Sequence, residues 1–325
     1  MDEQVLKAWA AEAGFAECAL CSTEDFETER RMVGAQPKLK ERAQLRFDPQ
    51  SDTPCAKSLA VLLWPYAPAA LPEDGCVFID SYYDASNAAY HAARQLEERL
   101  IGAGVYAKAN VSYPVKRAAV RAGLGLIGKS SLLITPKYGT RVVIILMATD
   151  IPIETVSHPE ELAASCAACG RCVKACPSGA LTEGGMEHPE RCMRNYMMEG
   201  IVVPDNLRSK MGMRLIGCDI CQRVCPMQPE MKADVQQGMR LDAFLSTEGT
   251  GFSAAAADLA ARIGRNAARP QRIRAQAAIL AGNSLNASYL PVLSEWALSD
   301  FPAVREHAKW ASAKIEAAMK SESGT

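Results

Sequence analysis

The spacing of cysteines between residues 166 and 225 constrains this 325-residue chain more than any other feature, because eight of its twelve cysteines lie there. Four of them read Cys166-Ala-Ala-Cys169-Gly-Arg-Cys172-Val-Lys-Ala-Cys176-Pro177. Three more read Cys218-Asp-Ile-Cys221-Gln-Arg-Val-Cys225-Pro226, the same order with Leu215 in place of a first cysteine. Cys192 stands alone between the two runs. What these thiols bind therefore decides how the middle of the chain folds.

The first run has the spacing C-x2-C-x2-C-x3-C-P of bacterial ferredoxins, in which three thiolates bind one cluster and the fourth reaches the other. Eight thiolates suffice for two 4Fe–4S clusters, with Cys192 as the ligand that Leu215 cannot supply. Disulfides would require an oxidising compartment, and zinc sites usually show two separated pairs of ligands. We assign Cys166, Cys169, Cys172 and Cys225 to one cluster, and Cys176, Cys192, Cys218 and Cys221 to the other.

Composition places few other limits on the chain. It is 49% hydrophobic with a formal net charge of −1, which allows ordinary cores and argues neither for nor against nucleic acid. No apolar run approaches 18 residues, so no membrane span is predicted. The acidic start, Met1-Asp-Glu-Gln, lacks the basic and apolar regions of a signal peptide. Many thiols without an export signal predict a cytoplasmic protein, in which Cys18, Cys21, Cys55 and Cys76 would be structural.

Hydrophobic periodicity predicts three regions. Residues 2–13 and 85–102 have helical periods, and the apolar runs over 15–20, 58–66 and 141–147 read as strands. Helices that alternate with strands predict an α/β fold, an α+β sandwich, for residues 1–155. The two-cluster segment, ferredoxin-like, occupies residues 156–232.

The last region, residues 233–325, is rich in alanine and has helical periods. Pro270, Gly282-Asn283 and Pro302 are expected to break it into helices. It reads as an all-α stack of paired helices, as in repeat proteins.

Gly123-Leu-Gly-Leu-Ile-Gly128-Lys129-Ser130 satisfies both G-x-G-x-x-G and the P-loop pattern. A P-loop follows a strand and opens a helix, whereas the residues before Gly123 look helical and Leu132-Leu-Ile-Thr135 looks like a strand. Pro136 also leaves little room for a helix. We therefore interpret the segment as a glycine turn that passes close to something large, with Lys129 and Ser130 as polar contacts.

Taken together, these features resemble the epoxyqueuosine reductase family, the cobalamin-dependent, double 4Fe–4S family that completes queuosine in tRNA. The resemblance covers nearly the whole chain, and its helical end is HEAT-like in the family. The cysteine runs alone are shared with many ferredoxins, but their combination with the glycine segment and the tail is specific. The matching stretches are 121–129, 166–181, Arg191-Cys192, 204–222, Ala281-Gly-Asn283 and Val304-Arg-Glu-His-Ala-Lys-Trp310.

The resemblance implies a cobalamin in the N-terminal domain with its lower base displaced, and no D-x-H-x-x-G stretch is present to supply a histidine to cobalt. Electrons would pass from a donor such as ferredoxin or flavodoxin through the clusters to cobalt, in a monomeric protein. The cofactor carries the hard chemistry, and the protein supplies position and electrostatics. The residues expected at the cobalamin are Arg117, Gly123, Gly125, Gly128, Lys129 and Ser130.

The chain departs from the family where a proton donor is expected. The family's Asp is replaced by Asn110 when Arg117 is kept in register, or by Val111 after a shift of one residue. Neither has a proton that titrates near neutral pH. Leu126 stands where the family has Trp, and Lys116 replaces a Glu. The changes lie around the expected substrate cavity, which suggests an altered substrate.

Other candidate proton donors are Tyr113 and His91, followed by Asp80, Asp84 and Tyr90. The preferred interpretation of His91 is a half-buried helix residue with a hydrogen-bond partner, and that of the two Asp residues is a loop or cap role. An arginine-rich stretch without acids could grip tRNA phosphates or be a solvated helix face. It comprises Arg262, Arg265, Arg269, Arg272 and Arg274.

Two functions compete with a cobalamin-dependent reductase. The first is an electron-transfer protein that reduces a partner's corrinoid and has no substrate of its own. The second is a ferredoxin module fused to a helical interaction domain, without cobalamin. Binding of a corrinoid separates these possibilities.

Overall fold

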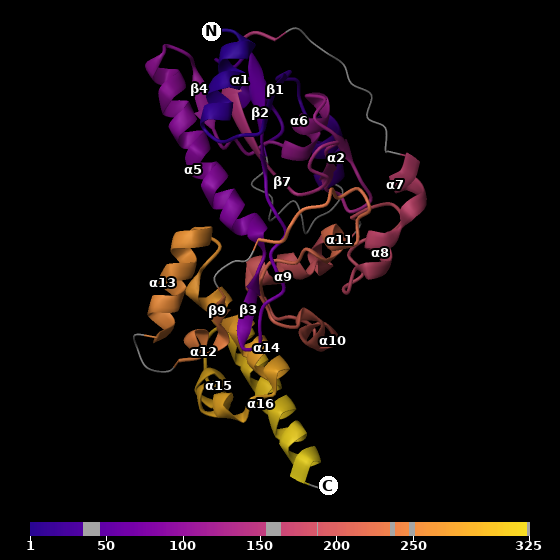
Figure 1. Cartoon of the computed structure of the whole chain (residues 1–325), viewed down its shortest axis with the longest axis vertical. Coiled ribbons are helices and arrows are strands. Elements are labelled where there is room, and N and C mark those ends of the chain that lie inside the picture. The colour runs from indigo at the N-terminus through magenta and orange to yellow at the C-terminus, as the bar shows by residue number, and fades with distance from the viewer. Residues whose placement is uncertain (35–45, 154–163, 187, 235–237, 247–250, 324–325) are drawn as a thin grey trace.

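The computed structural model describes residues 1–34, 46–153, 164–186, 188–234, 238–246 and 251–323. A sheet with its helices lies at the N-terminal end of the long axis, the C-terminal helices lie at the other end, and short helices join them (Figure 1). The expected boundary between residues 155 and 156 lies outside the described residues. Within those residues, no helix has the length and apolar character needed to cross a membrane.

The N-terminal part is built on an antiparallel sheet in the order β1-β2-β7-β4. Strands β2 and β7 are largely apolar because helices cover both faces, α1 and α5 on one and α6 on the other. The expected helices and strands of this part are confirmed, with ends shifted by a few residues. The elements are α1 (Glu3–Glu12), β1 (Glu17–Cys21), α2 (Glu27–Gly34), α4 (Pro49–Asp52), β2 (Ser58–Pro65), α5 (Ser81–Gly102), β4 (Ala107–Ala109), α6 (Val115–Arg121), β5 (Leu126–Ile127), β6 (Leu133–Ile134) and β7 (Val142–Thr149).

The cysteine-rich part consists of short helices and is joined to the other parts by a small sheet. Strand β3 (Cys76–Ile79) pairs in parallel with β8 (Arg214–Ile216) and antiparallel with β9 (Met239–Arg240). Residues far apart in the chain are thereby held together. The helices are α7 (Ala164–Cys169), α8 (Arg171–Ala175), the 3₁₀ helix η1 (Pro189–Arg191), α9 (Met193–Glu199), α10 (Asp205–Arg208), η2 (Ser209–Met211) and α11 (Ile220–Arg223).

The C-terminal part is helical, and one continuous hydrophobic core joins it to β3, α9 and β8. Helix α14 packs along α16, and α15 packs against α16 as well. The elements are α12 (Leu241–Phe244), α13 (Gly251–Ile263), α14 (Pro270–Ser284), η3 (Ala287–Tyr289), α15 (Leu290–Trp296) and α16 (Pro302–Ser323).

The expected helix break at Gly282-Asn283 is confirmed with a small shift, because α14 ends at Ser284 and Leu285 follows in the left-handed conformation. A Cβ at Gly282 would be 2.9 Å from the Cα of Ala311 on α16, so the glycine permits close helix packing. Asn283 donates to the carbonyl oxygens of Arg208 and Gly212. The helix begins as expected at Pro270, and α16 at Pro302, where proline suits the first helical position.

Candidate functional site

The eight cysteine thiols of the middle segment fall into two neighbouring groups. Burial raises the pKa of Cys225, and the charges of Cys166 and Cys169 raise it further. Cys172 is affected in the same way by Cys166 and Cys225. These four thiols therefore lie close together.

The second group surrounds Cys221, whose pKa is raised by burial and then by Cys218, Cys192, Cys172 and Cys176. Burial also raises the pKa of Cys218 to about 12, with a contribution from Cys192. The influence of Cys172, from the first group, indicates that the two groups are adjacent. Iron binding would remove these thiol protons, since a coordinating thiol is deprotonated. Among the described residues, no three His, Cys, Asp or Glu side chains converge on the position of a single metal ion.

The glycine segment forms a hairpin that touches the first thiol group. Helix α6 precedes it, and β5 and β6 pair antiparallel within it, so it lacks the strand and helix of a P-loop. A Cβ at Gly125 would be 2.3 Å from the carbonyl oxygen of Ile134, and one at Gly128 would be 3.3 Å from the Cys166 Sγ. The glycines therefore approach the opposite strand of their own hairpin and Cys166, which is a candidate cluster ligand.

Lys129 and Ser130 are not among the residues that line the cavity described below. The backbone N–H of Lys129 donates to the Cys166 Sγ at 3.4 Å, and its ammonium pairs with Glu183. Ser130 is buried. These residues fix the hairpin against the cysteine-rich part.

A cavity of about 610 Å³ lies beside the hairpin. It is lined by α2, by the loop between β4 and α6, by β7, and by Met186 and Pro189 of the cysteine-rich part. Ile127 and Ser131 of the hairpin also line it. The same hairpin thus contacts both the cavity and a thiol of the first group.

Three of the sequence-predicted site residues meet at this cavity: Asn110, Tyr113 and Arg117. The Asn110 Nδ2 is buried without a hydrogen-bond partner in the described structure. Tyr113 stacks on Phe26 at 6.4 Å. Arg117 forms an ion pair with Glu29 at 2.9 Å.

The hydroxyl of Tyr113 lies 3.4 Å from Thr53 Oγ1. Burial raises the pKa of this tyrosine, so it holds its proton at neutral pH.

The structure does not bring His91 to the cavity. His91 is exposed on α5 beside Tyr90, with ring centroids 5.5 Å apart. Both alternatives offered for His91, proton donor and half-buried helix residue, therefore differ from its observed place. Asp80 caps α5 by accepting from the Tyr82 N–H, as expected of a cap residue, and Asp84 pairs with Arg262.

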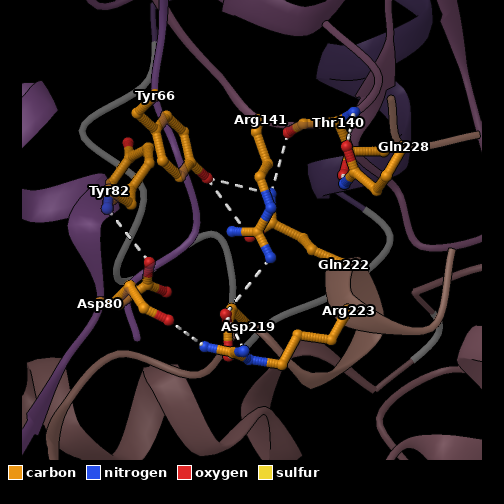
Figure 2. Close-up of polar contacts among 10 residues, drawn as sticks. Tyr66, Asp80, Tyr82, Thr140, Arg141, Asp219, Gln222, Arg223 and Gln228 are labelled. Carbon is orange, nitrogen blue, oxygen red and sulfur yellow. Dashed lines mark hydrogen bonds and ion pairs between the residues drawn. The ribbon is translucent and has the colours of Figure 1, made fainter. Parts of the chain in front are cut away.

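A buried polar network, not predicted from the sequence, lies between the sheet and the cysteine-rich part (Figure 2). Arg141, at the start of β7, pairs with Asp219 at 3.3 Å, and Asp219 also pairs with Arg223 at 2.8 Å. Gln222 donates to the carbonyl oxygen of Thr140 and to the hydroxyl of Tyr66. An arginine beside an apolar strand and a carboxylate between two cysteines were the signals available.

A second hollow, of about 540 Å³, lies beside the first thiol group. Cys225 and Pro226 form part of its wall, and the cations around it are Arg171, Lys174 and Arg223. Arg171 and Lys174 are exposed. The surface nearest Cys225 is therefore positively charged.

Comparison with known proteins identifies the architecture. Residues 165–228, which contain all eight cysteines of the middle segment, match the 4Fe-4S double cluster binding domain. The epoxyqueuosine reductase of Leadbetterella byssophila is 30% identical over 244 residues, a match that covers 68% of this chain and 78% of that protein. The chain belongs to the epoxyqueuosine reductase family.

A crystal structure of epoxyqueuosine reductase with an epoxyqueuosine-modified tRNA-Tyr stem loop is 25% identical, with a TM-score of 0.79. The likeness covers 96% of this chain and 90% of that one. The epoxyqueuosine reductase of Bacillus subtilis is 32% identical over 210 residues, or 62% of this chain. That alignment spans about half, 53%, of the Bacillus protein. The mixed α/β fold, the double-cluster domain and the C-terminal helices are therefore those of the family.

Proposed function

We propose that the protein is a cobalamin-dependent reductase with two 4Fe–4S clusters and a substrate that differs in part from epoxyqueuosine. The main support is the hairpin over residues 126–134, because its Lys129 contacts Cys166 and its Ile127 and Ser131 line the cavity. Electrons that reach the first thiol group would then have to cross only this hairpin to reach the cavity. The two groups of four thiols support the proposed ligand sets, Cys166, Cys169, Cys172 and Cys225 for one cluster and Cys176, Cys192, Cys218 and Cys221 for the other.

The cavity has features that suit a large cofactor with polar edges. Its wall is largely apolar, and the unpartnered Asn110 Nδ2 offers a donor at the edge. Cobalamin, when bound, would supply the reductive chemistry, and we propose the form with its lower base displaced. Arg117 would contact it directly, and Gly123, Gly125, Gly128, Lys129 and Ser130 would shape the hairpin beneath it.

The division into residues 1–155, 156–232 and 233–325 is part of the proposal, with the last region as HEAT-like repeats. A tRNA stem loop in the homologous crystal structure supports a tRNA ligand here. Arg265 and Arg269 are exposed and could contact phosphates. Arg262 is held by Asp84, and Arg274 lies over the ring of Phe252.

An acidic electron donor, such as ferredoxin or flavodoxin, would suit the positive surface beside Cys225. Complementary charge accelerates encounter between proteins, and Arg171 and Lys174 are exposed there. We propose that the protein acts as a monomer in the cytoplasm, where thiols stay reduced.

Cobalamin uptake tests the proposal. The protein with both clusters reconstituted is mixed with cob(II)alamin, and the visible and electron paramagnetic resonance spectra are recorded. A bound base-off species supports the reductase, and failure to bind any corrinoid would overturn it in favour of a ferredoxin module. Corrinoid binding without turnover of any substrate would favour the electron-transfer alternative.

Asn110 is the specific observation that favours an altered substrate. An amide cannot donate the proton that a departing epoxide oxygen needs. Asn110→Asp is expected to raise turnover of an epoxyqueuosine-containing anticodon stem-loop by roughly 10²-fold or more, the usual contribution of a general acid. The neighbouring change Val111→Asp is the control for register. No gain from Asn110→Asp would argue that another residue holds the acid position.

A further inference from the structure

The cavity carries a positive charge without a negative partner in the described part of the chain. Lys116 on α6 lines the cavity, and its ammonium donates to the carbonyl oxygen of Ser131. No ion pair of Lys116 with a described carboxylate is found, and the adjacent Arg117 already pairs with Glu29. A neutral carbonyl satisfies one donor of the ammonium but does not balance its charge.

The other charges near Lys116 are also positive. Burial lowers the pKa of Lys116, and the charges of Arg194 and Arg117 lower it further. The protonated lysine is therefore held at an energetic cost in the absence of an anion. That cost would be recovered by a ligand that brings a negative charge, because such pairs are stronger away from water.

A second donor at the same wall lacks an acceptor. The Asn110 Nδ2 is buried and unpartnered in the described structure. Asn110 and Ser131, which holds the Lys116 ammonium, have φ values of 57° and 56°. Non-glycine residues seldom adopt this conformation, and those that do are found preferentially at ligand sites. Only Leu285 shares this conformation among the other described non-glycine residues.

The remaining wall limits the ligand's shape. Val111, Ile127, Ile144 and Met186 line the cavity together with Lys116. These side chains offer an apolar surface, and the other charged residues of the wall, Glu29 and Arg117, pair with each other. A single anionic group on an apolar body matches this combination.

We propose that the cavity binds an oxyanion, a carboxylate or phosphate group, carried on an apolar body, with Lys116 as its cation and Asn110 as a neighbouring donor. The inference rests on the proposed function, because it names the substrate class of the same cavity. The oxyanion could belong to the substrate or to the phosphate of cobalamin's nucleotide loop.

Binding of benzoate and benzamide to the cluster-loaded, cobalamin-free protein tests the proposal by calorimetry. The two probes have nearly the same shape, and only benzoate is charged. Benzoate is expected to bind at least tenfold more tightly, and Lys116→Met to abolish that difference while Lys116→Arg retains most of it. Lys108→Met, an exposed change on β4, is the matched control and should have no effect. Equal binding of the two probes, or full discrimination by Lys116→Met, would overturn the proposal.

Two further arms identify the source of the oxyanion. Competition by inorganic phosphate reports whether phosphate is accepted. If the cobalamin phosphate occupies the site, Lys116→Met weakens uptake of cobalamin but not of cobinamide, which lacks the nucleotide. If a substrate carboxylate occupies it, both corrinoids bind the variant as they bind the wild type. Cobalamin binding without benzoate discrimination would refute this inference alone, and the reverse result would refute the proposed reductase alone. Unchanged cluster absorption shows that Lys116→Met has folded.

Discussion

Asp219 lies between two proposed cluster ligands, Cys218 and Cys221, and its carboxylate is fully buried. It neutralises Arg141, whose side chain is 4% exposed, and also pairs with Arg223. Removing one partner of a buried ion pair costs about 3–5 kcal/mol because the other charge remains buried. Asp219→Asn is therefore expected to lower the thermal unfolding midpoint by several degrees. Glu3→Gln, which removes an exposed pair with Lys7, should shift it by less than one degree, and equal shifts for both variants would contradict the role given to Asp219.

His307 is a second buried residue whose charge state matters. Its Nδ1–H donates to the carbonyl oxygen of Ala275, its Nε2 accepts from the Val203 N–H, and the side chain is fully buried. Burial lowers its pKa from 6.5 to about 4. The unfolded chain therefore binds more protons between these values, and stability is lost as the pH falls from about 6.5 to about 4.

The loss attributable to His307 is of order 3 kcal/mol. Thermal midpoints measured between pH 7 and pH 5 should fall less steeply in His307→Gln than in the wild type. His91→Gln, at an exposed position, should leave the slope unchanged. A wild-type slope in His307→Gln would show that other groups cause the pH dependence.

At the scale of elements, the close contact between α14 and α16 depends on the absence of a side chain at Gly282. A Cβ at Gly282 would lie 2.7 Å from the Trp310 ring and 2.9 Å from the backbone of Ala311. Glycine to alanine usually stabilises a helix by roughly 0.5–1 kcal/mol, but overpacking costs about 1–3 kcal/mol. Gly282→Ala is expected to lower the melting temperature, whereas Gly102→Ala, with open space around it, should not. A higher melting temperature for Gly282→Ala would show instead that α14 and α16 can move apart to accept the added methyl group at little cost.

Elements with strong local patterns were predictable from the sequence, and contacts between distant elements were not. The apolar run of β7 required a covered strand, and Pro270 marked the start of α14. Gly282 marked the end of α14 to within two residues, but its close approach to α16 could not be predicted without the partner helix. Asn110 and Arg117 were placed at one site through family resemblance. The partner of the Lys116 ammonium, a carbonyl oxygen and not a carboxylate, could not be predicted, because the hairpin of β5 and β6 brings Ser131 to it.

At the scale of the whole molecule, the cysteine-rich part is held between two bodies. The Arg141–Asp219 network ties it to the sheet, and the core around Met193 and Leu215 joins it to the C-terminal helices. The path proposed for electrons runs from the positive surface at Cys225 to the hairpin at Cys166. That path lies within the first thiol group, and the second group is adjacent to it.

Cys192 tests this arrangement, because it is the one proposed ligand that neither cysteine run contains. It acts on the thiols of Cys218 and Cys221, so Cys192→Ser should remove the second cluster and leave the first. Iron content is expected to fall by about half, because each cluster holds four of the eight irons. Cobalamin uptake should persist, since Cys192 is not among the residues around the cavity. Cys76→Ser, on β3, is the matched control and should keep the full iron content; full iron in Cys192→Ser would instead require a different eighth ligand.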